Sequence, residues 1–207
     1  MTVSVKICGI TLLEDALAAV QYGADALGFN FYPQSPRYIE PRMAEILLQD
    51  IPPSIHRVGV FVDDDPRTVA DIAVSLELDC LQFHGSESPE YCDSFGRPWY
   101  KAFRLHKPED PAAIAAYDSP WLMVDAYSPL TLGGTGELAR FDLALEAKTY
   151  GKLVLAGGLR PENILAALDA VAPEAVDVAS GVETQPGIKD HLRMESFISK
   201  VKQWKHA

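Results

Sequence analysis

A lysine and a cysteine two positions apart in the first apolar run are the residues best placed to do chemistry. The alternation of apolar residues over 3–8 predicts a strand with Lys6 and Cys8 on one face. Thr11 and Glu14 have the spacing of a capping box, which predicts a helix start. A nearby cation and a positive helix end both favour a thiolate, so we expect Cys8 to ionise near neutral pH. The alternative is that Cys8 is a small buried apolar residue, as most free cysteines are.

Two more side chains with acid–base chemistry lie at the ends of predicted strands. Asp125 ends the run 121–125 on the same face as Met123, where an aspartate is costly to bury without a function or a partner. It is a candidate functional residue, and the alternative is a cap or an ion pair to a loop. Gln82 and His84 point the same way at the end of an earlier strand. His84 is therefore a candidate for lining a site, or else a satisfied polar residue of the core.

The elements that must position these side chains are strands that alternate with helices along the whole chain. Apolar runs predict strands at 3–8, 24–31, 57–62, 80–83, 99–104, 121–125, 152–156 and 175–179. Helical patterns lie at 12–22, 41–49, 66–76, 89–95, 111–117, 141–150, 161–171 and 189–202.

Strict alternation predicts parallel strands joined by helical crossovers. Eight strand–helix units favour a closed (β/α)8 TIM barrel over an open sheet, built as a single domain over residues 1–207. No G-x-G-x-x-G pattern follows the first strand, which argues against a dinucleotide-binding fold. The C-terminal ends of barrel strands meet at one mouth, so we expect Cys8, His84 and Asp125 to lie there together.

Glycine-bearing turns end the last two predicted strands. Gly157 and Gly158 follow the seventh strand, and Ser180 and Gly181 follow the eighth. In barrels of this kind, backbone N–H groups at these positions commonly bind a phosphate, and glycines let it approach without the help of a lysine. We therefore predict a phosphate site at these four residues.

Lys6, Cys80 and Cys92 are predicted to have structural roles. Lys6 lies one layer below Cys8, and we expect it to pair with Asp177 on the neighbouring eighth strand, because an inward lysine needs a counter-charge. The alternative is that Lys6 tunes the ionisation of Cys8. Cys80 and Cys92 are expected to pack in the core.

Composition limits the classes of function. The net charge of −11 argues against nucleic acid as a partner, so local features must hold any anionic ligand. No apolar stretch reaches membrane-spanning length and the N-terminus lacks a signal-like core, so we expect a cytoplasmic protein without a membrane partner. The three cysteines include no Cys-x-x-Cys pair and the five histidines have no metal-like spacing. Neither a disulfide framework nor a metal site is expected.

Short motifs follow one another in order from the first strand into the last helix. They are KICGIT at 6–11, GF at 28–29 with SPRY at 35–38, QFHG at 82–85, Asp125 with GGTG at 133–136, AGGL at 156–159, and SGVE at 180–183 with PGIKD at 186–190. Together they resemble the phosphoribosylanthranilate isomerase family of tryptophan biosynthesis. One departure is Leu143 after Phe141 and Asp142, where the family usually has a tryptophan.

The resemblance implies an activity and a set of roles. The reaction would be the Amadori rearrangement of N-(5′-phosphoribosyl)anthranilate to 1-(2-carboxyphenylamino)-1-deoxyribulose 5-phosphate. Asp125, protonated in an apolar pocket, would act as general acid and Cys8 as general base. Arg37 would face the anthranilate carboxylate and His84 would line the pocket. No metal or organic cofactor is implied, the partner is a small phosphosugar, and the chain could be a monomer or a homodimer.

Other classes of protein share some of these features. A related phosphosugar enzyme would share the phosphate turns, but it would use a lysine acid or metal-binding histidines in place of a cysteine and an aspartate. A non-catalytic phosphosugar-binding barrel could lose the acid or the base, and this chain has both. A cysteine hydrolase would need an orienting histidine beside Cys8, for which only His84 is a candidate.

Overall fold

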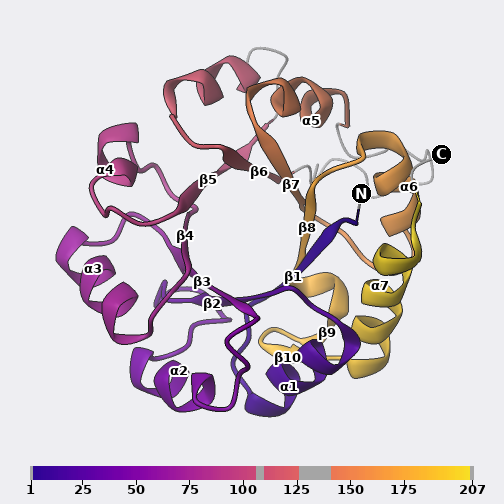
Figure 1. Cartoon of the computed structure of the whole chain (residues 1–207), viewed down its shortest axis with the longest axis horizontal. Coiled ribbons are helices and arrows are strands. Elements are labelled where there is room, and N and C mark those ends of the chain that lie inside the picture. The colour runs from indigo at the N-terminus through magenta and orange to yellow at the C-terminus, as the bar shows by residue number, and fades with distance from the viewer. Residues whose placement is uncertain (1, 106–109, 126–140, 206–207) are drawn as a thin grey trace.

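The predicted strands close into a barrel. The structure, a computed structural model, describes residues 2–105, 110–125 and 141–205. Eight parallel strands pair in chain order from β1 to β8, and β1 closes the ring against β8. Figure 1 shows this ring of strands with helices around its outside. The prediction of a (β/α)8 TIM barrel is therefore confirmed.

The strands have nearly the predicted bounds: β1 Ser4–Cys8, β2 Ala26–Asn30, β3 His56–Phe61, β4 Cys80–Phe83, β5 Trp99–Arg104, β6 Trp121–Asp125, β7 Lys152–Ala156 and β8 Ala175–Val178. The α-helices are α1 Leu13–Tyr22, α2 Pro41–Leu48, α3 Pro66–Ser75, α4 Pro89–Asp93, α5 Phe141–Ala147, α6 Ile164–Val171 and α7 His191–Gln203. The 3₁₀ segments of the described residues are η1 Asp110–Ala116, η2 Lys148–Tyr150 and η3 Ser180–Val182. Within the described residues, no helix has the length and apolar character needed to cross a membrane.

Local sequence explains several of the helix ends. The Asp65 carboxylate accepts hydrogen bonds from two backbone N–H groups of the first turn of α3, and the Ser88 hydroxyl accepts one from the first turn of α4. Each of these helices, like α2, has proline in its first turn, where no N–H is needed. Gly23 ends α1 in the left-handed conformation at φ 100°.

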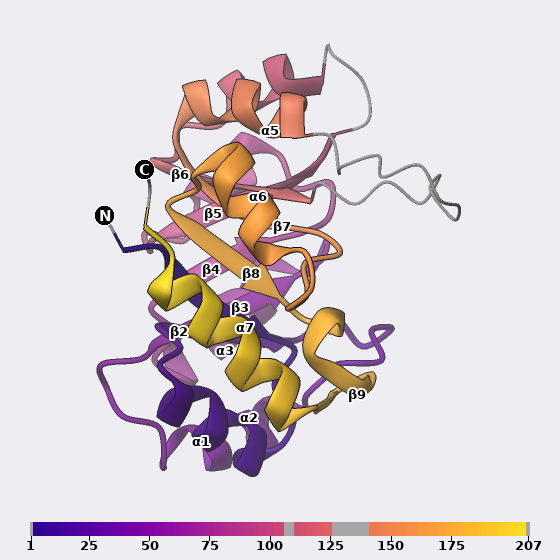
Figure 2. The same ribbon diagram turned by 90° about the vertical axis from the view of Figure 1, so that its right-hand side faces the viewer.

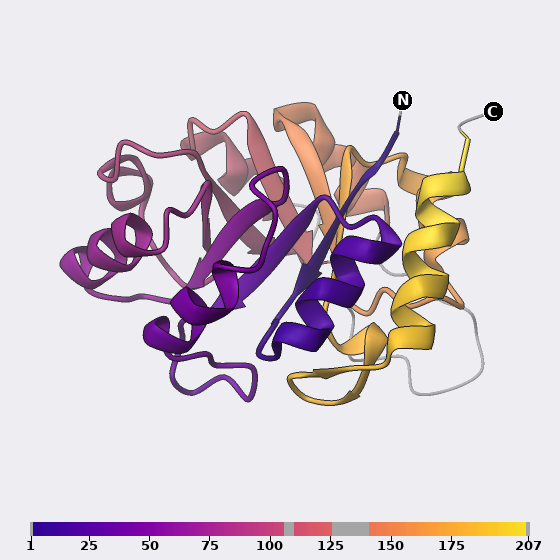
Figure 3. The ribbon, with the colours of Figure 1, turned by 60° about the horizontal axis from the view of Figure 1, so that its bottom comes forward.

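The predicted capping box at the start of α1 is wrong. The residue before the helix is Leu12, and it makes no side-chain capping bond. The Thr11 hydroxyl instead donates to the Gly187 carbonyl at 2.5 Å. Gly187 lies in a hairpin of β9 (Glu183–Gln185) and β10 (Ile188–Lys189), which no sequence pattern predicted. Figure 3 shows this hairpin beside the start of α1. The Thr11 hydroxyl therefore makes a tertiary hydrogen bond to the hairpin and does not cap the helix.

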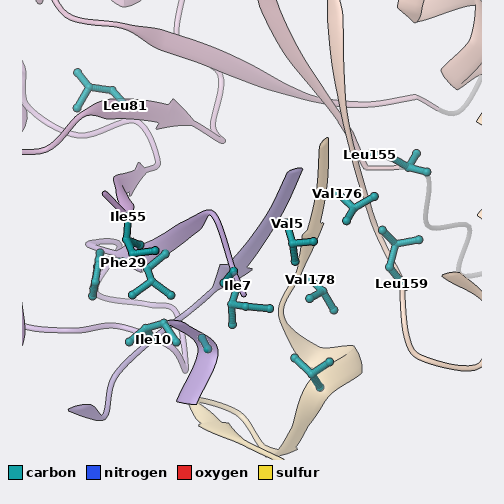
Figure 4. Close-up of a cluster of buried hydrophobic side chains, with 14 of the residues drawn as sticks. Val5, Ile7, Ile10, Phe29, Ile55, Leu81, Leu155, Leu159, Val176 and Val178 are labelled. Atoms are coloured by element: carbon teal, nitrogen blue, oxygen red, sulfur yellow. The ribbon is translucent and has the colours of Figure 1, made fainter. Parts of the chain in front are cut away.

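Buried apolar side chains form two clusters, one outside the ring of strands and one within it. The outer cluster joins strands to helices and includes Val5 and Ile7 of β1, which Figure 4 shows near Val176 and Val178 of β8. The inner cluster consists of Val58, Tyr100, Ala102, Met123, Val154, Ala156 and Ala175. Because Val5 and Ile7 point outward, Lys6 and Cys8 point into the barrel, as predicted.

The two other cysteines pack in these clusters as expected, with Cys92 in the outer one and Cys80 against the inner one.

A buried ion pair ties the loops after neighbouring strands together. Lys101 of β5 lies 3.3 Å from the Glu87 carboxylate and donates to the Gly85 carbonyl at 2.6 Å. Glu87 in turn accepts from the backbone N–H groups of Gly85 and Asp63, each at 2.9 Å. Both charged side chains are at most 5% exposed. This pair holds the ends of β3 and β4 in place, and the mouth of the barrel depends on those ends.

We expect Lys101→Met to destabilise the protein by about 3–5 kcal/mol, because it leaves the Glu87 charge buried without its cation. The matched control is Lys202→Met, which removes a lysine from a partly exposed pair with Asp25 and should cost less than about 1 kcal/mol. Urea unfolding measures both values. Equal, small losses in the two variants would contradict the structural role given to Lys101.

Candidate active site

The C-terminal ends of the strands surround a cavity of about 970 Å³. Side chains from distant parts of the sequence line it together, as expected for a barrel mouth. Of the predicted site residues, those that line the cavity are Cys8, Arg37, His84, Asp125, Gly157, Gly158 and Ser180. Gly181 is not among the lining residues. Figure 2, a side view, shows β8 running toward the end of the barrel where β9 lies.

Cys8 is the last residue of β1 and is held from two sides. Its backbone carbonyl accepts a hydrogen bond from Lys189 Nζ at 2.6 Å. In register on β2 lies Gly28, where an added Cβ would stand 2.9 Å from the Cys8 Sγ and 2.8 Å from the Lys6 Nζ. Gly28 therefore leaves the space that the thiol and the ammonium occupy.

Lys6 makes the predicted ion pair. Its Nζ lies 2.6 Å from the Asp177 carboxylate, with both side chains less than 10% exposed. The same ammonium donates to Gln82 Oε1 at 2.9 Å. The structural interpretation of Lys6 is thus confirmed.

The ionisation of Cys8 differs from the prediction. Burial raises the pKa of the Cys8 thiol, the Asp177 carboxylate raises it further, and the Lys6 ammonium lowers it without reversing the net effect. The expected low pKa rested on Lys6 and the helix end, whereas burial is the largest influence and Asp177, the predicted partner of Lys6, raises the pKa as well. Cys8 is therefore a protonated thiol at neutral pH in this structure.

His84 and Asp125 occupy neighbouring parts of the cavity wall. Burial first, and Arg104 second, lower the pKa of His84, so its ring is neutral at pH 7. Asp125 is half-buried at the end of β6, in register with Arg104 of β5. Met123, on the same face of β6, belongs to the inner cluster, as predicted. The surroundings of Asp125 include the charged Arg104 and so are less apolar than expected.

Arg37 is paired with a carboxylate and is therefore not a solvated loop arginine. Its Nε donates to Glu183 Oε1 at 2.9 Å and its Nη2 donates to Oε2 at 2.6 Å. Glu183 also accepts from Lys189 Nζ at 2.8 Å, and its side chain is 3% exposed. Burial alone would raise the pKa of Glu183, but Arg37 and Lys189 hold it below its ordinary value. Glu183 and Lys189 belong to the last motifs of the chain, yet sequence reasoning assigned them no role.

The glycine turns have the backbone geometry that only glycine adopts readily. Gly157 and Gly158 have φ values of 90° and 60°. At Gly181 an added Cβ would lie 1.8 Å from the Leu159 carbonyl oxygen, so the turns after β7 and β8 are in direct contact. Asn163 secures the first turn by donating from Nδ2 to the Gly158 carbonyl at 3.0 Å.

Two of the predictions made from the sequence extend to residues outside the described ranges. The GGTG motif at 133–136 lies outside the described residues. Within the described ranges, no group of three or more His, Cys, Asp or Glu side chains is arranged to hold a metal ion.

A closed (β/α)8 barrel with ionisable side chains around a cavity at the strand ends is the arrangement found in barrel enzymes. A sequence model of the family described as N-(5′-phosphoribosyl)anthranilate (PRA) isomerase matches residues 5–200 of the chain. The chain belongs to this family, and it is an isomerase of tryptophan biosynthesis.

Individual relatives and solved structures agree with the family match. The N-(5′-phosphoribosyl)anthranilate isomerase of Geobacter sulfurreducens is 48% identical over 98% of this chain and 100% of its own length. The crystal structure of phosphoribosyl anthranilate isomerase from Thermotoga maritima has a TM-score of 0.90 and 42% identity, covering 98% of this chain and 100% of that one. A phosphoribosyl anthranilate isomerase structure in complex with reduced 1-(o-carboxyphenylamino)-1-deoxyribulose 5-phosphate has a TM-score of 0.88, 40% identity and the same coverage.

The environment of Cys8 predicts how the free thiol reacts. Its raised pKa keeps it protonated at pH 7, so alkylation by iodoacetamide should be slow there and should accelerate with a midpoint above that of an ordinary cysteine. Peptide mass spectrometry of the pH series measures this for Cys8 separately from the other cysteines. Cys80 is the internal control, because burial raises its pKa to about 12. A Cys8 midpoint below about pH 8 would contradict this description of the site.

Proposed function

We propose that the chain catalyses the Amadori rearrangement of N-(5′-phosphoribosyl)anthranilate with Cys8 as general base and Asp125 as general acid. The observation that carries the proposal is that both side chains line one cavity from strands that are not neighbours, β1 and β6. A substrate between them could meet an acid on one side and a base on the other. The product analogue bound to one structural relative supports the same substrate class.

The rearrangement needs one proton donor and one proton acceptor. Asp125 would protonate the furanose ring oxygen, the ring C–O bond would break, and the anthranilate nitrogen would form a Schiff base with C1. This Schiff base acidifies C2, from which Cys8 would remove the proton to give an enolamine. Protonation of C1 and loss of the enol proton then give the ketone. The steps are balanced without an oxidant, a reductant or a metal ion.

The raised pKa of Cys8 sets the pH dependence of this mechanism. A thiol with a raised pKa is protonated below that value and becomes the thiolate as the pH rises through it. The small thiolate fraction at pH 7 is a strong base, and the nearby Lys6 and Lys189 cations favour its formation. The rate should therefore increase with pH on the limb that belongs to Cys8.

The rest of the cavity would bind the substrate through its anionic groups. Glu183 engages Nε and Nη2 of Arg37, so the anthranilate carboxylate would be met by the remaining amino group of the guanidinium. The phosphate would lie at the turns of Gly157, Gly158, Ser180 and Gly181, bound by backbone N–H groups. His84 would line the sugar site.

The wider setting is also part of the proposal. We expect one domain over residues 1–207, working as a monomer or a homodimer with no cofactor and no nucleic acid or membrane partner. All three cysteines are free, which fits a cytoplasmic location, where thiols stay reduced.

The direct test follows the fluorescence of enzymatically generated phosphoribosylanthranilate after the protein is added in the presence of EDTA. The wild-type protein should consume it rapidly, and Cys8→Ala or Asp125→Asn should lower kcat by about 10²–10⁴-fold while leaving the protein folded. Cys92→Ala and Asp71→Asn, which make the same chemical changes away from the cavity, should retain activity.

Two outcomes would contradict the proposal. No consumption by the folded wild-type protein would favour a non-catalytic phosphosugar-binding barrel or a related phosphosugar enzyme. Near-wild-type turnover by either cavity variant would overturn the assignment of base and acid.

A further inference from the structure

We infer that Gln82 is a positioning residue that fixes the tautomer of His84, so that the ring carries its proton on Nε2 and donates it to an oxygen of the substrate. The tautomer follows from the contacts of Gln82 alone. Only the identity of the acceptor oxygen rests on the proposed function, in which His84 lines the sugar site.

The orientation of the Gln82 amide is determined by its neighbours. Its Oε1 lies 2.9 Å from Lys6 Nζ and 2.9 Å from the Tyr100 hydroxyl, and the side chain is fully buried. An ammonium group has hydrogens and no lone pair, so the amide atom that it meets must be the oxygen. The reversed amide would direct an NH₂ group at the ammonium. The amide nitrogen therefore faces the other way.

That nitrogen faces His84. Gln82 Nε2 lies 2.9 Å from His84 Nδ1 and 3.4 Å from the Met123 sulfur. Both amide hydrogens and both oxygen lone pairs of Gln82 are thus used. Because Nε2 of Gln82 can only donate, His84 Nδ1 must accept, which leaves the proton of the neutral ring on His84 Nε2.

The ring is neutral because of the groups around it. Burial and the Arg104 guanidinium of β5 lower the pKa of His84, as does Lys6 of β1. Asp125 of β6 and Asp177 of β8 act in the opposite direction, but they do not reverse the shift. A second proton on Nδ1 would also point at the amide hydrogens of Gln82.

A series of hydrogen bonds that begins at the floor of the cavity therefore sets the orientation of His84. Asp177 holds Lys6, Lys6 and Tyr100 hold the Gln82 oxygen, and Gln82 sets His84. These residues come from four strands, so the order of the barrel itself maintains the tautomer. The other tautomer would present a lone pair on Nε2, which could accept from a hydroxyl but could not donate to an oxygen that only accepts.

A fixed donor of this kind contributes to binding in the ground state and the transition state alike, so its loss should appear mainly in KM. Gln82→Glu replaces the donor with a second acceptor and should move the proton to His84 Nδ1. We expect this variant to raise KM about tenfold with a smaller change in kcat. Gln21→Glu makes the same charge change on the exposed face of α1 and should leave both constants unchanged.

The tautomer is measured by ¹⁵N chemical shifts of the imidazole nitrogens, with His84 assigned by comparison with His84→Asn. Wild-type protein should show a protonated Nε2 and an unprotonated Nδ1, and Gln82→Glu should show a protonated Nδ1. A wild-type ring protonated on Nδ1 would overturn the inference, and this measurement needs no substrate.

The kinetic outcome separates the two proposals. If the tautomer is as inferred but KM does not change in Gln82→Glu, the substrate contact of His84 is wrong. If the protein lacks isomerase activity while the wild-type tautomer is as inferred, the proposed mechanism fails and the role of Gln82 in setting the ring stands.

Discussion

The ion pair between Lys6 and Asp177 is the interaction on which the rest of the site depends. It joins β1 to β8, the first and last strands, where the barrel closes, and the two residues are in register across that seam. Removing either partner would leave a buried charge without compensation, a cost of about 3–5 kcal/mol. The pair also supports the cavity floor, because Lys6 directs the amide of Gln82 and lies beneath the thiol of Cys8.

Charge compensation beneath and beside the cavity decides how its reactive groups behave. Burial and, after it, the Asp177 carboxylate raise the pKa of Cys8, so Cys8 remains a thiol in the free protein. Glu183 lies between Arg37 and Lys189. In a chain with a net charge of −11, each of these cations is paired with a carboxylate, Lys6 with Asp177 and both Arg37 and Lys189 with Glu183. An anionic substrate would therefore add its charge to a site whose cations are already oriented, which limits the reorganisation required on binding.

The fold, the positions of the site residues and the Lys6–Asp177 pair follow from sequence, whereas the other contacts within the site do not. Alternating strands and helices predict the barrel, and strand parity correctly directs Lys6 and Cys8 inward, because both are local patterns. The capping box failed because the Thr11 hydroxyl bonds to Gly187, which is 176 residues away. The predicted direction of the Cys8 pKa was wrong because burial, and after it the Asp177 carboxylate, raises this pKa by more than the Lys6 cation lowers it. The Arg37–Glu183 pair depends on a hairpin that carries no periodic signal.

The proposed mechanism rests on the removal of the C2 proton of the sugar by Cys8. Its most direct test is the single-turnover rate with substrate that carries deuterium at C2, measured for wild-type protein and for Cys8→Ser. The account predicts a primary isotope effect in the wild-type protein and, in the variant, a much slower proton-transfer step that still shows the isotope effect. A variant that transfers this proton at the wild-type rate would show that another group is the base, and the assignment of Cys8 would be wrong.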